Sequence, residues 1–439
     1  MSFSRPRGEA GTLLGAQLVF NLGFYAVIPF LAGAMGGEYG LDAVAVGLVL
    51  GARTFSQQGM FLLGGLVSDR WGARRAILLG CLVRISGYAV LAAASDFSSF
   101  LLGAVLTGAG GALFSPALES QLSHADHGTE DSRPAGRKKG RRSVFVWLSI
   151  TGEIGALFGP VLGASLLGWG FDAALALGIG VFSVVTVLLW FRLPSSIPAN
   201  PPTTAAAEPE SPHTGHHGAL GCLRNRRFVL FCVLASTNML AYNQLYFAVP
   251  LELGRRGLDA SWLAGLFLLA SVLTLVLQLP VSSAGRRLGP GRALSVGFVL
   301  LGSAFVTVAL TSDHAGSSGS SIAPLAGATG LLILGHMLLT PTILSLIPEY
   351  LPADGGAGGR GAYYGLAASC GGISVLAGNA VMGQLVDLTD RLNWWPGTPW
   401  VPPVLLALLT AVALPRALPP KSTVAPAPYA TATGSAADG

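Results

Sequence analysis

Residues 65–75 have the sequence GLVSDRWGARR and form a short charged turn between two long apolar stretches. Gly65 allows a neighbouring helix to approach closely, and Gly72 permits a tight turn. Asp69 stands at the end of the first stretch, where its carboxylate can accept hydrogen bonds from the N-terminus of a facing helix. The segment therefore predicts a hairpin of two apolar helices joined by a turn that lies in water.

The composition places these helices in a membrane. Of the 439 residues, 51% are hydrophobic and only 11% are charged, whereas a soluble domain carries about 25% charged residues. This composition excludes a soluble multidomain enzyme. A membrane-spanning helix needs about 20 predominantly apolar residues. The sequence predicts twelve such spans, the last interrupted by two prolines, at residues 11–34, 45–68, 74–95, 97–122, 143–168, 171–192, 227–252, 260–284, 291–311, 323–350, 361–387 and 396–415.

Basic residues are distributed unequally between the two sides of the predicted helices. If both termini lie in the cytoplasm, the inside segments hold 21 of the 26 lysines and arginines, and the outside loops hold three. Cytoplasmic loops of membrane proteins are enriched in these residues. We therefore expect a multi-pass protein of a bacterial plasma membrane with both termini in the cytoplasm. The basic stretch 124–142 is either a solvated inside loop or a contact for anionic lipids.

A polar stretch divides the chain into two blocks of six spans. It is rich in Pro, Ala, Thr and His, which is typical of a flexible linker. The predicted domains are an N-terminal six-helix bundle (1–193), a cytoplasmic linker (194–226), a C-terminal six-helix bundle (227–418) and a disordered cytoplasmic tail (419–439).

The two blocks repeat each other at a nearly constant offset. Tyr25 corresponds to Tyr242 and Gly72 to Gly289, and the members of each pair are 217 residues apart. Two six-span repeats related by an axis normal to the membrane are the internal symmetry of one large transporter fold. We therefore expect an all-α membrane protein with twelve transmembrane helices in two six-helix repeats.

The charged turn also carries a family resemblance. The pattern Gly65-x-x-x-Asp69-Arg70-x-Gly72 resembles the signature loop of the major facilitator superfamily, although Ala73 replaces the arginine that usually follows the glycine. The resemblance implies the major facilitator fold, in which two six-helix halves rock about a central site and expose it to each side in turn.

The fifth span contains a second motif. Gly155, Gly159, Pro160 and Gly163 resemble the antiporter signature of drug/proton exchangers. The three glycines fall on one helix face, which would let a helix of the other half pack closely, and the proline would bend the span. The alternative is generic packing of small residues, which is common in membranes.

Residues of the second and third spans resemble one particular branch of this superfamily. Arg53, Gln57 and Gln58 in the second span and Arg84 in the third are similar to the MdtH-type multidrug efflux branch of the drug/proton antiporter family. Because a charge at the bilayer centre costs at least about 2.5–3.5 kcal/mol, such groups are kept for a reason or lie where water reaches them. Glu153 in the fifth span is the expected proton carrier, with Arg53 and Arg84 as its coupling partners. The alternative is a static ion pair between Glu153 and one of the two arginines.

Another set of residues is expected to control access to the centre. Glu119, near the cytoplasmic end of the fourth span, would pair with Arg70 or Arg74 and close the inside; otherwise it is a solvated carboxylate at a helix end. The predicted gating residues are Asp69, Arg70, Arg74, Glu119, Gly155, Gly159, Pro160 and Gly163.

Polar and aromatic side chains recur every four residues in the first and seventh spans. These spans line the cavity in the resembled fold, so the predicted substrate-binding residues are Gln17, Asn21, Tyr25, Asn238, Tyr242, Tyr246 and, from the tenth span, His336. Neutral aromatic stripes suit amphipathic or cationic compounds. The alternatives are helix packing at a polar seam and, for His336, a hydrogen-bonded packing role.

The sequence contains no nucleotide-binding, nucleophile or metal-ligand pattern. No enzymatic activity, cofactor, metal or nucleic-acid partner is therefore expected. The expected function is that of a monomeric secondary active transporter in the lipid bilayer that exports small amphipathic or cationic compounds in exchange for protons. Two alternatives are a proton-coupled symporter that imports a small metabolite and a non-transporting membrane sensor on the same fold.

Overall fold

The computed structural model describes residues 9–130, 144–193, 221–312, 321–351 and 359–418. This part of the chain is helical, with no strand. The first half contains α1 (Glu9–Gly37), α2 (Ala43–Gly59), α3 (Phe61–Trp71), α4 (Ala73–Ala92), α5 (Phe97–Glu130), α6 (Val144–Leu166) and α7 (Phe171–Arg192). The second half contains α8 (Gly221–Arg224), α9 (Arg226–Asn243), α10 (Ala248–Arg255), α11 (Ser261–Leu288), α12 (Pro290–Thr311), α13 (Ala323–Leu346), α14 (Gly359–Leu392) and α15 (Val401–Ala413).

Eleven helical segments of the described chain are long and apolar enough to cross a membrane. The remaining predicted span, 45–68, is divided into α2 and α3 at Met60, directly after Gly59, because glycine favours the helix weakly. The span 227–252 is likewise divided into α9 and α10, since a turn occupies residues 244–247. Residues 226–255 still form one of the eleven candidate spans, whereas neither α2 nor α3 is among them, and the all-helical membrane fold is confirmed.

The ends of several spans also differ from the prediction. The fourth predicted span ends at residue 122, but α5 continues to Glu130. Pro402 and Pro403 lie in the first turn of α15, where a missing N–H breaks no helical hydrogen bond, so they begin the helix instead of interrupting it. Most of the predicted linker 194–226, the predicted tail 419–439 and part of the basic stretch 124–142 lie outside the described residues.

The turns of the two halves share a conformation at the predicted repeat. Gly72, between α3 and α4, has φ 87° and ψ 143°, and Gly289, between α11 and α12, has φ 76° and ψ 160°. Side chains with a Cβ rarely adopt a positive φ, which explains glycine at both positions.

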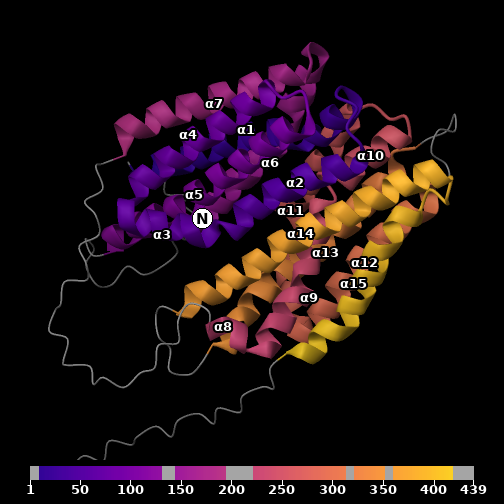
Figure 1. Cartoon of the computed structure of the whole chain (residues 1–439). Coiled ribbons are helices and arrows are strands. Elements are labelled where there is room, and N and C mark those ends of the chain that lie inside the picture. The colour runs from indigo at the N-terminus through magenta and orange to yellow at the C-terminus, as the bar shows by residue number, and fades with distance from the viewer. Residues whose placement is uncertain (1–8, 131–143, 194–220, 313–320, 352–358, 419–439) are drawn as a thin grey trace, which may run out of the picture.

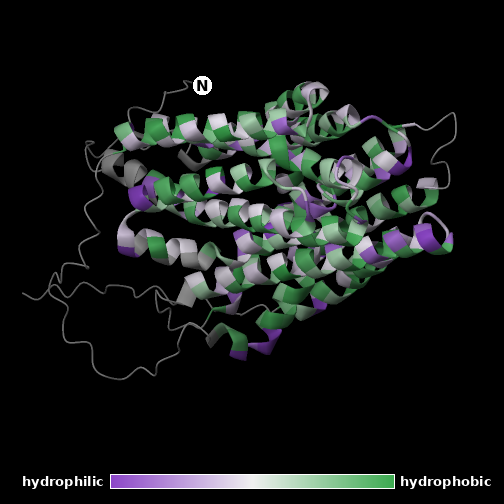
Figure 2. Ribbon diagram, turned by 45° about the horizontal axis from the view of Figure 1, so that its top comes forward, coloured by the Kyte–Doolittle hydropathy of each residue, from purple (hydrophilic) through white to green (hydrophobic). Residues whose placement is uncertain are grey.

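The surface of the bundle is apolar along its length. Figure 2 shows hydrophilic residues gathered near the ends of the helices, while apolar residues cover their middle. Large side chains such as Leu279 and Val276 are 77% and 65% exposed there. An apolar belt of this kind matches a hydrocarbon surrounding and not water.

The two halves lie side by side, and α2 of the first packs along α14 of the second (Figure 1). We call the end of the bundle where α7 stops and α8 begins the linker end, and the end where α2 begins and α10 stops the loop end. Glycines permit the close approach: a Cβ on Gly47 would lie 2.5 Å from the carbonyl oxygen of Asn379, and one on Gly51 would lie 2.8 Å from the Cα of Leu376.

A carboxylate joins the halves at the loop end. Asp387 of α14 accepts hydrogen bonds from the backbone N–H groups of Ala43 and Val44, at 3.1 and 3.2 Å, and so caps the N-terminus of α2. The partial positive charge of a helix N-terminus favours a carboxylate at this place. We call this contact the Asp387 cap.

Candidate functional site

A cavity of about 280 Å³ lies between the two halves. The first half contributes side chains from α1 and α6, and the second half contributes side chains from α9, α11 and α13. The cavity extends from the middle of the bundle toward the linker end. Its lining residues are Tyr25, Glu153, Ala156, Tyr242, Phe267, Ala270, Ser271, Thr274, Gln278, Ile333, His336, Met337, Thr340, Pro341 and Leu344.

A hydrogen-bonded group of side chains forms one wall of the cavity. Asn238 donates from Nδ2 to the hydroxyl of Thr340 at 3.1 Å, and its Oδ1 lies 3.1 Å from Nδ1 of His336. Because an amide oxygen only accepts, Nδ1 of His336 carries the proton in this contact. The imidazole also stacks on the ring of Tyr242, with centroids 4.2 Å apart. The wall therefore presents a flat aromatic surface whose polar atoms are held in place.

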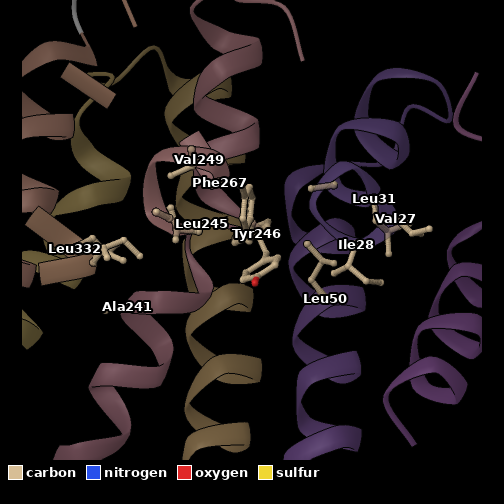
Figure 3. Close-up of a cluster of buried hydrophobic side chains, with 14 of the residues drawn as sticks. Val27, Ile28, Leu31, Leu50, Ala241, Leu245, Tyr246, Val249, Phe267 and Leu332 are labelled. Atoms are coloured by element: carbon tan, nitrogen blue, oxygen red, sulfur yellow. The ribbon is translucent and has the colours of Figure 1, made fainter. Parts of the chain in front are cut away.

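Aromatic rings close the cavity on the side of the loop end. Tyr246 packs edge-on against Phe267, with ring centroids 5.1 Å apart, and Phe267 also meets Tyr25 at 6.3 Å. Figure 3 shows Tyr246 projecting from the second half toward Leu50 and Ile28 of the first. The centre of the protein is thus separated from the loop end by rings from both halves.

Glu153 is the one carboxylate among the residues that line the cavity. Its side chain is half-buried on α6, and it forms no ion pair within 4.0 Å with Arg53 or Arg84. The static ion pair considered from the sequence is therefore absent from this structure. The charge of this carboxylate faces aromatic rings and hydroxyl groups instead of a fixed cation.

The two arginines lie inside the first half and outside the cavity lining. Nη2 of Arg53 donates to Oε1 of Gln57 at 2.6 Å, and Nε of Arg84 donates to the carbonyl of Thr107 at 3.2 Å. Both guanidinium groups also lie over aromatic rings: Arg53 is 4.6 Å from the centroid of Phe24. Cation–π contacts of this kind stabilise a desolvated guanidinium by about 2 kcal/mol. Their part in proton coupling stays a prediction.

Only some of the polar and aromatic side chains predicted to bind substrate lie at the cavity. Tyr25, Tyr242 and His336 line it, and Asn238 and Tyr246 contact lining residues. Gln17 and Asn21 do not belong to the lining. Asn21 faces α6 instead.

The glycines of the predicted antiporter motif pack against α1. A Cβ on Gly155 would lie 2.6 Å from the Cβ of Asn21, and one on Gly159 would lie 2.5 Å from the Cβ of Tyr25. We expected a helix of the other half to occupy this face, which is wrong, because α1 belongs to the same half. This contact holds α6, which also carries Glu153, close against α1.

The predicted gating residues at the linker end are only partly described. The side chain of Asp69 lies outside the described residues, and those of Arg70 and Glu119 are exposed with no ion pair between them. Arg74 donates to the carbonyl of Trp190 on α7 at 2.6 Å. The pairing of Glu119 with a basic residue stays a prediction for another conformation.

Sequence reasoning missed the wall that α11 provides. Ser271, Thr274 and Gln278 all line the cavity, together with Phe267. They are spaced by three and four residues and so share one face of an apolar helix. That spacing is a signal in the sequence that could have identified them.

The arrangement suits the recognition of a small ligand. Aromatic faces bind flat or cationic groups, and a carboxylate in the same cavity adds charge complementarity. Within the described residues, no group of three or more His, Cys, Asp or Glu side chains could hold a metal ion.

Comparisons with known proteins agree with this architecture. The family model described as "Major Facilitator Superfamily" matches residues 13–359. An uncharacterized MFS-type transporter of Mycobacterium tuberculosis is 32% identical, with 89% of this chain and 88% of the relative covered. A multidrug resistance protein MdtH of Escherichia coli is 26% identical, with 94% and 95% covered. A crystal structure of a nucleoside transporter NupG mutant, 13% identical, matches with a TM-score of 0.74 over 93% of this chain and 99% of that one.

Proposed function

The chain belongs to the major facilitator superfamily of membrane transporters, and from that premise we propose that it exports small amphipathic or cationic compounds in exchange for protons. The likeness to the multidrug resistance proteins named MdtH supports drugs as the substrate class. The substrate would bind in the central cavity, between the wall formed by Tyr242 and His336 and the carboxylate of Glu153.

The observation that carries this proposal is the unpaired carboxylate of Glu153 in an otherwise neutral aromatic cavity. A desolvated carboxylate is neutralised by a proton or by a cationic ligand. Both neutralise the same group, so they exclude each other. Competition of proton and substrate for one site gives exchange when the two halves change state only with one of them bound.

Alternating access would determine the direction in which the substrate is transported. The unequal distribution of basic residues supports a cytoplasmic linker end. The cavity reaches toward that end, while the Asp387 cap joins the halves at the opposite end. In this proposal the structure represents a state closed to the outside, in which substrate would enter from the cytoplasm.

Vesicle transport tests the proposed exchange. Purified protein would be reconstituted into liposomes, and the movement of ethidium would be followed by fluorescence under an imposed pH gradient. Exchange predicts that ethidium moves against the proton flux, and that reversing the gradient reverses its movement. For one-for-one exchange, a gradient of about two pH units sustains at most about 100-fold accumulation. Movement of the dye with the protons would favour the symporter, and no movement of ethidium or of a panel of other compounds would favour the sensor.

Loss of the Asp387 cap should open the loop end more often. Asp387→Ala removes both acceptors from the N-terminus of α2, and charge-assisted hydrogen bonds of this type contribute about 1.5–3 kcal/mol. A cysteine in place of Ala34, which is 6% exposed between α1 and α10, should react with a membrane-impermeant maleimide about tenfold faster in the variant.

The control for this prediction lies on the same helix. Asp390→Ala removes a carboxylate that pairs with Arg255 inside the second half, so it should leave the labelling rate unchanged. Equal rates for the two variants would contradict a closing role for the Asp387 cap.

A further inference from the structure

Two of the four cysteines of the chain meet across the contact between α9 and α14. Cys232 belongs to α9 and Cys370 to α14, and both are free thiols. Their sulfur atoms lie within hydrogen-bonding contact, in which either thiol can donate. Neither residue lines the central cavity, so the proposed exchange leaves this pair of thiols without a role.

The packing of the two helices independently places these cysteines opposite each other. The ring of Phe228 on α9 lies 4.5 Å, centroid to centroid, from the ring of Tyr363 on α14. Farther along, a Cβ on Gly378 of α14 would overlap the side chain of Leu240 of α9. The members of these two contacts are 135 and 138 positions apart in the sequence, so the helices run parallel in a nearly constant register. The two cysteines are likewise 138 positions apart.

The pair is enclosed by protein on one side and open to the bilayer on the other. Cys232 is 1% exposed, whereas Cys370 is half-buried. Ile373 and Val381 follow Cys370 by three and eleven positions and so share its helix face. These two side chains are 55% and 54% exposed within a membrane span, where apolar exposure means contact with lipid. A lipophilic molecule dissolved in the bilayer can therefore reach Cys370, and through it Cys232.

Two adjoining thiols in apolar surroundings select a ligand by its valence and shape. Zinc takes four ligands in structural sites, but no group of three or more His, Cys, Asp or Glu in the described part of the chain could hold a metal. A univalent copper ion would leave a net negative charge on two thiolates, which is unfavourable away from water. Linear mercury(II) would hold the sulfurs on opposite sides, although here they are in contact. Pyramidal arsenic(III) with one organic group holds two sulfurs on the same side and gives a neutral product.

We propose that Cys232 and Cys370 form a dithiol site that captures lipophilic organoarsenic(III) compounds from the bilayer. With phenylarsine oxide, two As–S bonds form while the two S–H bonds break, and the arsenic oxygen leaves with both thiol protons as water. Arsenic remains As(III), so the step requires no oxidant or reductant. The first bond forms at the accessible Cys370. The second, to Cys232, is then intramolecular and is favoured by proximity.

Intact-mass measurement on two matched variants tests the site. A variant with Cys81→Ser and Cys222→Ser retains only the proposed pair, and a variant with Cys232→Ser and Cys370→Ser retains the other two thiols. Each purified full chain would be treated with phenylarsine oxide and then with excess glutathione, which removes arsenic from single thiols but not readily from a chelating pair. We expect the first variant to keep one phenylarsenic group per chain and the second to keep none. The dithiol 2,3-dimercaptopropanol should release the group from the first variant.

A measurement on the unmodified protein keeps the test independent of the folding of these variants. After the same treatment and digestion with trypsin, the peptide that contains Cys232 should be linked through phenylarsenic to the peptide that contains Cys370. The proposal is overturned if these peptides are unlinked, if the variant with only the proposed pair loses its arsenic to glutathione, or if both variants retain arsenic equally.

Discussion

Replacing Glu153 by glutamine is expected to abolish proton-driven export while the protein still reaches the membrane. The amide fills the same place in the cavity but neither takes up a proton nor attracts a cation. One-for-one exchange of a proton for a monovalent cation moves no net charge, so a gradient of about two pH units alone would sustain at most about 100-fold accumulation of ethidium. In vesicles containing Glu153→Gln, the accumulation ratio of ethidium should fall to about 1, far below the ratio that the unmodified protein reaches.

Two measurements make this expectation specific. Asp172→Asn changes an exposed carboxylate outside the cavity lining and should leave the accumulation ratio of ethidium near that of the unmodified protein. Binding of ethidium to Glu153→Gln should be weaker and should lose its dependence on pH. An unchanged accumulation ratio in Glu153→Gln would show that another group carries the proton.

Replacing Gly163 by valine is expected to prevent the first half from assembling. A Cβ at this position would overlap the carbonyl of Ala26 and lie 2.5 Å from Cε2 of Phe30, both on α1. Because backbone cannot move aside as a flexible side chain can, α6 would have to separate from α1. Overpacking of this kind costs about 1–3 kcal/mol or more, and the yield of monodisperse protein in size-exclusion chromatography should fall at least about tenfold.

A glycine with free space provides the control for this substitution. Gly180 on α7 has nothing within 4 Å of an added Cβ and an ordinary helical backbone. Gly180→Val should therefore give nearly the yield of the unmodified protein. A normal yield and melting temperature for Gly163→Val would show that the contact between α1 and α6 is looser than the structure indicates.

The scaffold was predictable because a hydrocarbon solvent leaves few choices for the backbone. Residues 171–192 were predicted as a span, and α7 has these bounds. The interruptions at Met60 and at residues 244–247 escaped prediction, because average hydropathy does not register a local break in helical geometry. Gly59 precedes the first break and Asn243 precedes the second, and both residues favour the helix weakly.

The candidate site was predictable in composition but not in arrangement. Periodicity indicates which side chains share a helix face, but it does not identify the helix that meets this face. Asn21 and Asn238 occupy corresponding positions in the repeat, yet Asn21 faces glycines of α6 while Asn238 bonds to His336 of α13. The difference arises from the neighbours, since small residues on α6 bring it close to α1. The high average hydropathy of α11 likewise gave no indication that Ser271, Thr274 and Gln278 share a polar face.

The Asp387 cap affects how closure of the loop end responds to salt. Exposed ion pairs weaken as the ionic strength of the surrounding medium rises, because mobile counter-ions screen them. A half-buried carboxylate that accepts two peptide N–H groups depends less on such screening than an exposed lysine–glutamate pair would. In the orientation proposed above, closure of the loop end should therefore depend little on the salt concentration outside the cell.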